Sequence, residues 1–350
     1  MLRIVTTLEK DKWDQIVRSY ENWDIYYLCE YAEMFRVHGD GEPILIDFSD
    51  GNDRLCYVVM VQDIANDERF RGKLETGKYF DCETPYGYGG PLTDKPVSNH
   101  GRILFQNELT EYAKENGIVS QFVRFHPLLM NDTALPELFQ TRYLHKTIYI
   151  DTASPELIMS NMDSKNRNMV RKAIKNGVTI VRKPIDEYSD FIPIYEETMD
   201  KDNAGDYYYF KEDYFKEQIN LRDNACFFYA MKDDEPIAAA IMYYNDRYMH
   251  YHLAGTHTEY RKYSPSNLLL YEAACWASEK GIKRFHLGGG IVEDDNLFGF
   301  KKQFNKNDRL SFYIGRTVFE EDIYNKLMKI REESDSSFNV NNNRMIQYRA

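Results

Sequence analysis

Apolar residues recur along this chain at helical spacing in some segments and in short strand-like runs in others. Between residues 264 and 280, Leu269, Ala273 and Trp276 fall on one helical face because three or four positions separate them. Residues 225–254 form three successive strand-like segments. Gly117 stands where a predicted helix at 98–116 has to end. The pattern therefore predicts an α/β protein.

The predicted elements follow one another closely along both halves of the chain. In the first half we expect helices at 9–19, 26–37 and 98–116, and strands at 43–49, 54–62 and 118–125. In the second half we expect strands at 145–151, 177–182, 225–231, 236–244, 247–254, 283–287 and 309–314. The helices expected there are 155–176, 186–200, 211–220, 264–280, 294–304 and 319–330.

The length of 350 residues exceeds what one ordinary core accommodates and suits two domains. We expect a first domain at 1–145 and a second at 146–331. Residues 332–350 are rich in Ser, Asn and Asp, so a loosely ordered tail is predicted there.

Two short internal echoes bear on how the domains arose. Residues 113–118 resemble residues 277–282, and each ends a predicted helix and enters an apolar strand. The turn at 52–54 likewise resembles the turn at 245–247. Tandem duplication of one α/β unit and chance similarity both account for these matches.

Charge and cysteine content exclude several classes of protein. The net charge is −12, whereas a protein that coats nucleic acid is normally basic, so only a local basic patch stays open. The sequence shows no signal-peptide pattern and no run of about 18 apolar residues, so we expect a cytoplasmic protein that does not cross a membrane. The five cysteines are scattered and form no CxxC pair, which fits a reducing compartment.

The start of the helix at 264–280 is a candidate anion site. Ser264 is a good N-cap residue and Pro265 suits the first helical position. Arg261 and Lys262 precede them, so free N–H groups and positive charge would meet there. A well-capped helix without a ligand explains the same residues.

Three adjacent glycines at 288–290 end a predicted strand and allow a ligand to approach the backbone closely. They contain no dinucleotide-binding fingerprint. Further on, Lys301 lies among Phe298, Phe300 and Phe304, and a lysine beside buried aromatics can stabilise charge on an acyl intermediate. This predicts a site for an acyl or phosphate-bearing donor.

A basic stripe is predicted on the helix near 164–175. Arg167, Arg171 and Lys175 are spaced by four residues, so they share one helical face and repel one another. Such a stripe favours an anionic partner, here a phosphate or a tRNA. A solvated helix face is the other explanation.

The loop at 84–91 alternates glycines with Tyr86 and Tyr88, as loops that line substrates often do, although a rigid turn explains it equally well. His250 and His252 lie on one strand face without a nearby cysteine or acidic partner, so no metal site is predicted. The sequence has neither a nucleophile elbow nor a P-loop.

Several of these segments together resemble the FemAB family of aminoacyl transferases within the GNAT acyltransferase superfamily. The similar segments are 164–178, 254–256, 287–289, 294–298, Phe300 with Lys301, 313–315 and Tyr324. The resemblance implies tandem GNAT-like domains that meet near residue 145, each with a mixed twisted sheet flanked by helices. No coiled-coil arm of the kind found in some relatives is present.

The resemblance also implies roles for particular residues. Lys301 occupies the position of the lysine that supports transfer of an aminoacyl group from charged tRNA to an amine of a peptidoglycan precursor. Tyr214 and Tyr251 would help to line the precursor site. Arg36 is the nearest candidate for binding the precursor's phosphate. The implied donor-binding residues are Arg261, Ser264, Ser266, Asn267, Gly288 and Gly289.

The sequence departs from GNAT enzymes that use acetyl-CoA. Their loop reads Gln/Arg-x-x-Gly-x-Gly/Ala, whereas Ser264 and Ser266 replace both glycines here. Tyr208 and Phe210 stand where some relatives carry Thr and Arg, which puts the usual precursor in doubt.

We therefore expect acyl transfer, most simply of an aminoacyl group, to an amine of a nucleotide- or lipid-linked cell-envelope precursor, as in cell wall biogenesis. No tightly bound cofactor is expected, and the donor would be aminoacyl-tRNA or acetyl-CoA. Two alternatives stay open: an acetyl-CoA-dependent N-acetyltransferase acting on an amino sugar, and a non-catalytic binding module that retains the fold.

Overall fold

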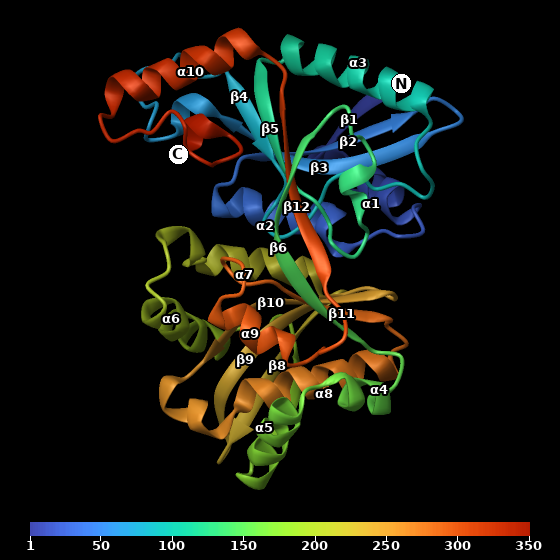
Figure 1. The fold of residues 1–350 in the computed structure, drawn as a ribbon, viewed down its shortest axis with the longest axis vertical. Helices are drawn as coiled ribbons and strands as arrows, with labels where there is room; N and C mark the ends of the chain where they lie inside the picture. Colours follow the sequence, from blue (N-terminus) through green and yellow to red (C-terminus); the bar gives the residue numbers. More distant parts are fainter. The chain divides into compact units, whose positions relative to one another are not determined.

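A computed structural model describes residues 1–350, which divide into two compact units (Figure 1). The first unit joins Met1–Leu144 to Phe312–Ala350, and the second comprises His145–Ser311. This division differs from the predicted one at its C-terminal end. Residues 312–331 were expected to finish the second domain, yet they belong to the first unit.

The first unit is a six-stranded sheet with helices packed against it. Its strands lie in the order β1 (Leu2–Thr6), β2 (Glu42–Ser49), β3 (Arg54–Asp63), β4 (Phe80–Glu83), β5 (Ile118–Arg124), β12 (Leu310–Val318). Its helices are α1 (Lys10–Arg18), α2 (Cys29–His38), α3 (Asn99–Glu115) and α10 (Glu321–Ser334). Every neighbouring pair is antiparallel except β4 and β5, which are parallel. Strands β1 and β4 were not predicted from the sequence.

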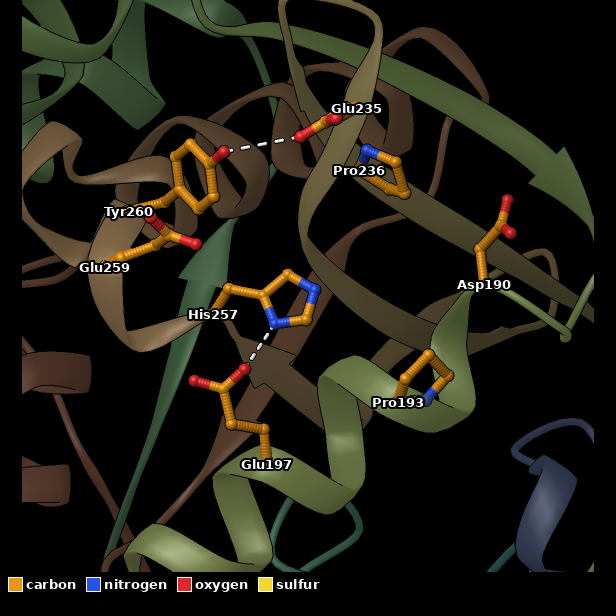
Figure 2. Close-up of a pocket in the computed structure, with 8 residues that line it drawn as sticks. All are labelled: Asp190, Pro193, Glu197, Glu235, Pro236, His257, Glu259 and Tyr260. Atoms are coloured by element: carbon orange, nitrogen blue, oxygen red, sulfur yellow. Dashed lines mark hydrogen bonds and ion pairs between the residues drawn. The ribbon is translucent and has the colours of Figure 1, made fainter.

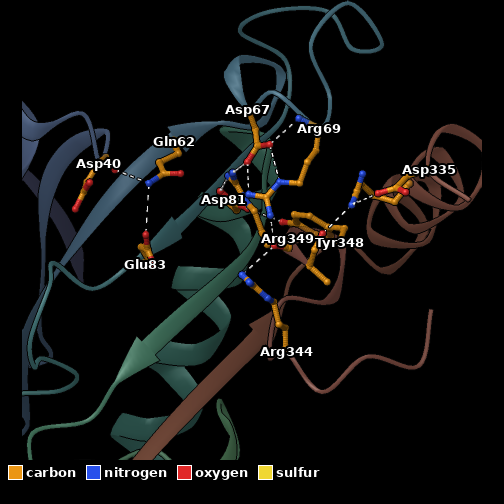
Figure 3. Close-up of polar contacts among 12 residues, drawn as sticks. Asp40, Gln62, Asp67, Arg69, Asp81, Glu83, Asp335, Arg344, Tyr348 and Arg349 are labelled. Atoms are coloured by element: carbon orange, nitrogen blue, oxygen red, sulfur yellow. Dashed lines mark hydrogen bonds and ion pairs between the residues drawn. The ribbon is translucent and has the colours of Figure 1, made fainter. Parts of the chain in front are cut away.

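The predicted loose tail is instead packed onto the first unit. Tyr348 is fully buried, and its hydroxyl donates to Asp81 at 2.8 Å. The Arg349 guanidinium lies between the carboxylates of Asp67 and Asp81, as Figure 3 shows. The polar composition of 332–350 hid these two anchoring residues, because composition averages over a segment that needs few contacts to be ordered.

The second unit is also a six-stranded sheet with helices on both faces. Its strands lie in the order β6 (Gln140–Asp151), β11 (Arg284–Gly288), β10 (Tyr248–Thr256), β9 (Glu235–Tyr244), β8 (Ala225–Lys232), β7 (Thr179–Pro184). Its helices are α4 (Pro155–Asn161), α5 (Ser164–Lys175), α6 (Phe191–Lys201), α7 (Glu212–Gln218), α8 (Pro265–Glu279) and α9 (Asn296–Lys302). The helices predicted around 155–176 are α4 and α5, which are separated at Met162, whose backbone is extended.

Alternation along β10 separates the two faces of this sheet. Tyr251 packs into the core that contains the apolar face of α8. The next residue, His252, points to the other face, where the hydroxyl of Tyr214 on α7 lies 2.9 Å from its Nε2. Helix α6 packs closely on that face, since a Cβ at Gly255 would lie 2.3 Å from the carbonyl oxygen of Ile194.

The two units repeat one strand topology. In the second unit the only parallel pair is β10 with β11, and the other neighbouring pairs are antiparallel. Gly117 and Gly281 occupy equivalent places between a helix and a strand, and both have left-handed φ angles, 65° and 77°. The predicted tandem α/β arrangement is thus confirmed.

The second sequence echo is not an equivalence. The turn at 52–54 joins β2 to β3, whereas the turn at 245–247 joins β9 to β10, whose counterparts are β3 and β4. Such turns resemble each other because tight turns use the same small polar residues. No helix combines the length and the apolar character needed to cross a membrane.

Candidate active site

The candidate site begins where two parallel strands of the second unit part. Strands β10 and β11 are in register only from Tyr248 opposite Arg284 to His250 opposite His286. Beyond this point β10 continues to Thr256, while β11 ends at Gly288. The separation leaves β10 backbone groups from Tyr251 onward without β11 partners in the register, and such groups can pair with a ligand.

Lys301 lies at this separation and is buried, with only 8% of its surface exposed. Its Nζ donates a hydrogen bond to the carbonyl oxygen of Gly289 at 2.7 Å and lies 5.8 Å from the ring centroid of Tyr251. No carboxylate forms an ion pair with it. Burial lowers the pKa of Lys301 to about 8, although the charge of Asp295 favours the ammonium form. Lys302, by contrast, is exposed.

The loop between β11 and α9 is closed by Asp295. Its carboxylate accepts hydrogen bonds from the backbone N–H groups of Ile291, Val292 and Phe298. The same side chain therefore caps α9 and fixes the loop that precedes it. These bonds lower the pKa of Asp295 despite its partial burial.

The predicted anion cradle at α8 differs from the expectation. Ser264 makes no side-chain capping bond and adopts a left-handed conformation with φ 59°. Its hydroxyl instead approaches the sulfur of Met169 at 3.4 Å. Arg261 is exposed. The cap prediction was wrong, because the preceding 3₁₀ segment turns the serine away from the helix N–H groups.

The other predicted donor residues connect secondary-structure elements. The Ser266 hydroxyl is 2.7 Å from that of Thr256 at the end of β10. Asn267 donates to the side chain of Asn166 on α5 at 2.8 Å, and Asn166 donates to the carbonyl oxygen of Gln303 at 3.3 Å. These bonds connect α5, α8 and the end of α9, so they help to fix the helix that carries Lys301.

The basic stripe on α5 is only partly available to a partner. Arg171 and Lys175 are exposed, and neither pairs with a carboxylate. Arg167 is half-buried and donates to the carbonyl oxygen of Met162, which occupies part of its guanidinium. Two cations of the predicted stripe are therefore exposed, and Lys165 and Lys172 on the same helix are exposed too, in an otherwise acidic protein.

The predicted precursor-binding tyrosines do not share one wall. Tyr251 lies beside Lys301, whereas Tyr214 is 1% exposed and lies on the opposite face of the sheet. Burial lowers the pKa of its partner His252 to about 3, so that imidazole is neutral at pH 7. Tyr214 therefore packs against β10 on the face of the sheet opposite Lys301, and it is too buried to contact a substrate.

The remaining predicted substrate residues belong to the first unit. Arg36 on α2 is exposed and pairs with Glu33 one helical turn away, at 2.7 Å. Tyr86 stacks on Phe35 with ring centroids 6.0 Å apart, and Tyr88 packs against Tyr26 at 5.4 Å. Arg36 thus lies on α2, and the loop at 84–91 contacts this helix through Tyr86 and Phe35.

A separate hollow of about 530 Å³ opens on the second unit, lined by Asp190, Pro193, Glu197, Glu235, Pro236, His257, Glu259 and Tyr260 (Figure 2). It includes none of the residues predicted from the sequence. Glu197 accepts from the Thr258 N–H at 2.7 Å and pairs with His257, and these bonds lower the pKa of Glu197 to about 2. The ion pair joins α6 to the end of β10, a structural role.

Sequence reasoning missed this pair, because it considered His250 and His252 but not His257, which follows β10. Glu197 precedes His257 by 60 positions, on a helix that packs across the sheet. Only the packing of α6 on β10 brings the two side chains together.

Comparisons with known proteins agree with the geometry. Residues 164–302 match a family model described as acetyltransferase (GNAT) domain. No curated protein sequence matches the chain.

Solved structures with the same fold are distant in sequence. A structure named FemX is 14% identical, with a TM-score of 0.69 over 93% of this chain and 99% of that one. The C-terminal domain of a putative lysylphosphatidylglycerol synthetase from Agrobacterium fabrum is 14% identical, with a TM-score of 0.57 over 89% and 92%. L-PGS from Bacillus licheniformis is 13% identical, with a TM-score of 0.54 over 88% and 91%. The fold implied by the FemAB and GNAT resemblance is confirmed.

Proposed function

We propose that this acyltransferase, with its GNAT domain at residues 164–302, transfers an aminoacyl group from charged tRNA to an amine of a cell-envelope precursor. The reaction would take place in the cytoplasm. The precursor would be a nucleotide- or lipid-linked amino sugar or peptide of the kind used in peptidoglycan synthesis.

The observation that carries this proposal is the state of Lys301. Its ammonium is buried, donates one hydrogen bond to Gly289 and has no carboxylate partner. An ammonium has three N–H donors, so two remain for an oxygen that enters the gap between β10 and β11. Burying a cation without a counter-ion is costly, and a charge that develops on a substrate would balance it.

The chemistry then needs positioning and charge stabilisation but no covalent enzyme intermediate. The acceptor nitrogen attacks the ester carbon, a C–N bond forms, and the carbonyl oxygen becomes negative next to Lys301. The ester C–O bond breaks, the ribose hydroxyl leaves with a proton, and the nitrogen loses one. Tyr251 covers the ammonium and keeps water away from it.

Three features favour an RNA-linked donor. Arg171 and Lys175 present positive charge from the C-terminal half of α5. Asn166, in the first turn of the same helix, donates to the carbonyl oxygen of Gln303, two residues after Lys301. The loop at 261–266 lacks both glycines that a CoA pyrophosphate loop usually carries. The sequence resembles the FemAB family, in which charged tRNA is the donor, and the FemX structure shares the fold of this chain. Under this proposal no cofactor is tightly bound.

Acetyl transfer from acetyl-CoA to an amino sugar is the second candidate, favoured by the description of the matched family model. Ser264 keeps the left-handed conformation that a glycine would adopt easily, so the loop retains part of the required shape. For the acceptor, the candidate in the second unit is Tyr251, which lies beside Lys301.

The test measures single-turnover transfer from aminoacyl-tRNA and from acetyl-CoA to nucleotide-linked muramyl peptides and amino sugars. With the active pair, Lys301→Ala should lower the rate about 10²- to 10³-fold with little change in substrate binding. Lys302→Ala is the matched control, since its side chain points about 100° away around α9 and is exposed.

Equal small effects in both variants would reduce the two lysines to a solvated helix end. Transfer from acetyl-CoA alone, with no transfer from any charged tRNA, would put the second candidate in place of the first.

A further inference from the structure

We propose that Gly289 and His145 are positioning residues for the Lys301 ammonium: the Gly289 carbonyl accepts its hydrogen bond, and His145 packs against Gly289 and holds that carbonyl in place. The proposal rests on the proposed function, in which Lys301 stabilises charge on the acyl group. It gives Gly289 a role different from the donor binding that its sequence context predicts.

These residues meet at the end of β11, next to its neighbouring strand β6. Gly288, the last residue of β11, has a left-handed φ of 74°, which turns the following peptide out of the strand. After this turn, the Gly289 carbonyl oxygen accepts the hydrogen bond from Lys301 Nζ at 2.7 Å. The backbone of residue 289 therefore sets the position of the lysine charge.

Residue 289 has room for hydrogen only. A Cβ there would lie 2.5 Å from Cε1 and 2.7 Å from Nδ1 of His145, and 2.8 Å from the carbonyl oxygen of Lys146. Such separations are too short for any real carbon, so a side chain would displace either the imidazole or the Gly289 peptide. His145 is buried, with 8% of its surface exposed, and its Nδ1 is 3.0 Å from the carbonyl oxygen of Lys146, so the ring has little freedom to withdraw.

The other end of the loop is fixed just as firmly. A Cβ at Gly290 would lie 2.1 Å from an Asp295 carboxylate oxygen, so this residue also packs without a side chain. Asp295 in turn caps α9, the helix that carries Lys301. The hydrogen-bond acceptor and the lysine are thus held by one closed loop, and His145 supports that loop from the neighbouring strand.

The experiment follows the titration of Lys301 itself and needs no substrate. In the full chain labelled with ¹³C at lysine Cε, the Lys301 signal is assigned by its loss in Lys301→Arg and then followed against pH. The wild-type midpoint should lie near its pKa of about 8. In Gly289→Ala it should fall below that value, because the ammonium stays buried but loses its acceptor.

Adding His145→Ala to Gly289→Ala removes the two closest atoms but leaves the Lys146 carbonyl oxygen 2.8 Å from the added Cβ, so the midpoint should recover only part of the way towards about 8. His145→Ala alone leaves the β11 backbone unchanged, and it replaces Gly289→Ala as the test variant if Gly289→Ala does not fold. Without the imidazole, water can reach the Gly289 carbonyl, so the midpoint of the Lys301 titration should rise towards the ordinary lysine value. The control is Gly299→Ala on α9, where an added Cβ meets nothing within 4 Å.

An unchanged midpoint in both Gly289→Ala and His145→Ala would overturn the proposal. So would weaker binding of acetyl-CoA or charged tRNA by Gly289→Ala with an unchanged Lys301 titration, which would place Gly289 in the donor site. Normal turnover of Lys301→Ala is a separate outcome that contradicts only the proposed function.

Discussion

At the scale of single residues, Lys301 is buried although a charged side chain is more stable in water. It is a charged side chain in a site where Phe298 and Phe304 are buried, and its ammonium donates one hydrogen bond and lies near one aromatic face. Proteins keep such residues where function needs them, at a cost in stability. Its aromatic surroundings could be read from the sequence, whereas the lack of a counter-ion could not, because that depends on what the fold brings near.

Replacing Lys301 with methionine should therefore lower the transfer rate about 10²- to 10³-fold and stabilise the protein by roughly 1–2 kcal/mol at pH 7. Between about pH 8 and pH 10.5 the unfolded chain holds the proton that the folded chain releases, so wild-type stability rises with pH there. The advantage of methionine should then shrink. Urea unfolding at pH 7 and at pH 10 measures this; an equal difference at both would show that the charge carries no penalty.

At the scale of elements, the chain uses α5 for two purposes. Its buried side, with Val170 and Ala173, packs against α8, while Asn166 bonds to α8 and to the end of α9. Its outer side presents Arg171 and Lys175 to solvent. The helical spacing predicted the stripe, yet the structure divides it, because Arg167 turns back onto the carbonyl of Met162.

If the outer side of α5 contacts the donor RNA, Arg171→Ala with Lys175→Ala should weaken binding of charged tRNA. The slope of log K against log salt should fall by roughly 1–2, since two fewer phosphates are neutralised. Stability should change by less than about 0.5 kcal/mol, because both side chains are exposed. Filter binding at several salt concentrations measures the effect.

Lys329→Ala is the control for this experiment, because Lys329 is an exposed lysine on α10 that pairs with Glu333. Equal tRNA affinity of the double variant and the wild type would identify the α5 stripe as a solvated face.

At the scale of the whole molecule, the last residues complete the first unit. The Arg349 guanidinium bonds to both carboxylates of the pair Asp67 and Asp81, which lie on a loop and on β4. The hydrogen bonds and charges of Arg69 and Arg349 hold the pKa of Asp67 well below its ordinary value. This pairing contributes stability above the ordinary aspartate pKa, and the contribution is lost as pH falls below it.

Arg349→Ala should destabilise the first unit by about 2–4 kcal/mol, because two partly buried carboxylates lose their shared partner. Hydrogen exchange should accelerate in β4 and in residues 345–350 but not in β8 or β9 of the second unit. Arg344→Ala, whose side chain is exposed and contacts only a carbonyl, is the control. Uniform acceleration in both units would contradict an effect local to the first.

Local pattern alone determined much of this protein. Hydrophobic spacing predicted most helices and strands within a few residues, because burial on one face repeats at 3.6 or 2 positions wherever an element packs. It also placed Lys301 among buried aromatics and Gly281 at the end of a helix. These features depend on neighbours within a few residues, so one sequence is enough to show them.

Tertiary structure decided the rest. Arg349 meets Asp81 across 268 positions, and His257 meets Glu197 across 60, so no local pattern could reveal either pair. The left-handed Ser264 and the inclusion of 312–350 in the first unit were likewise not predicted. Each results from packing between distant segments, whose free energy outweighs the weak local preferences of a serine cap or a polar tail.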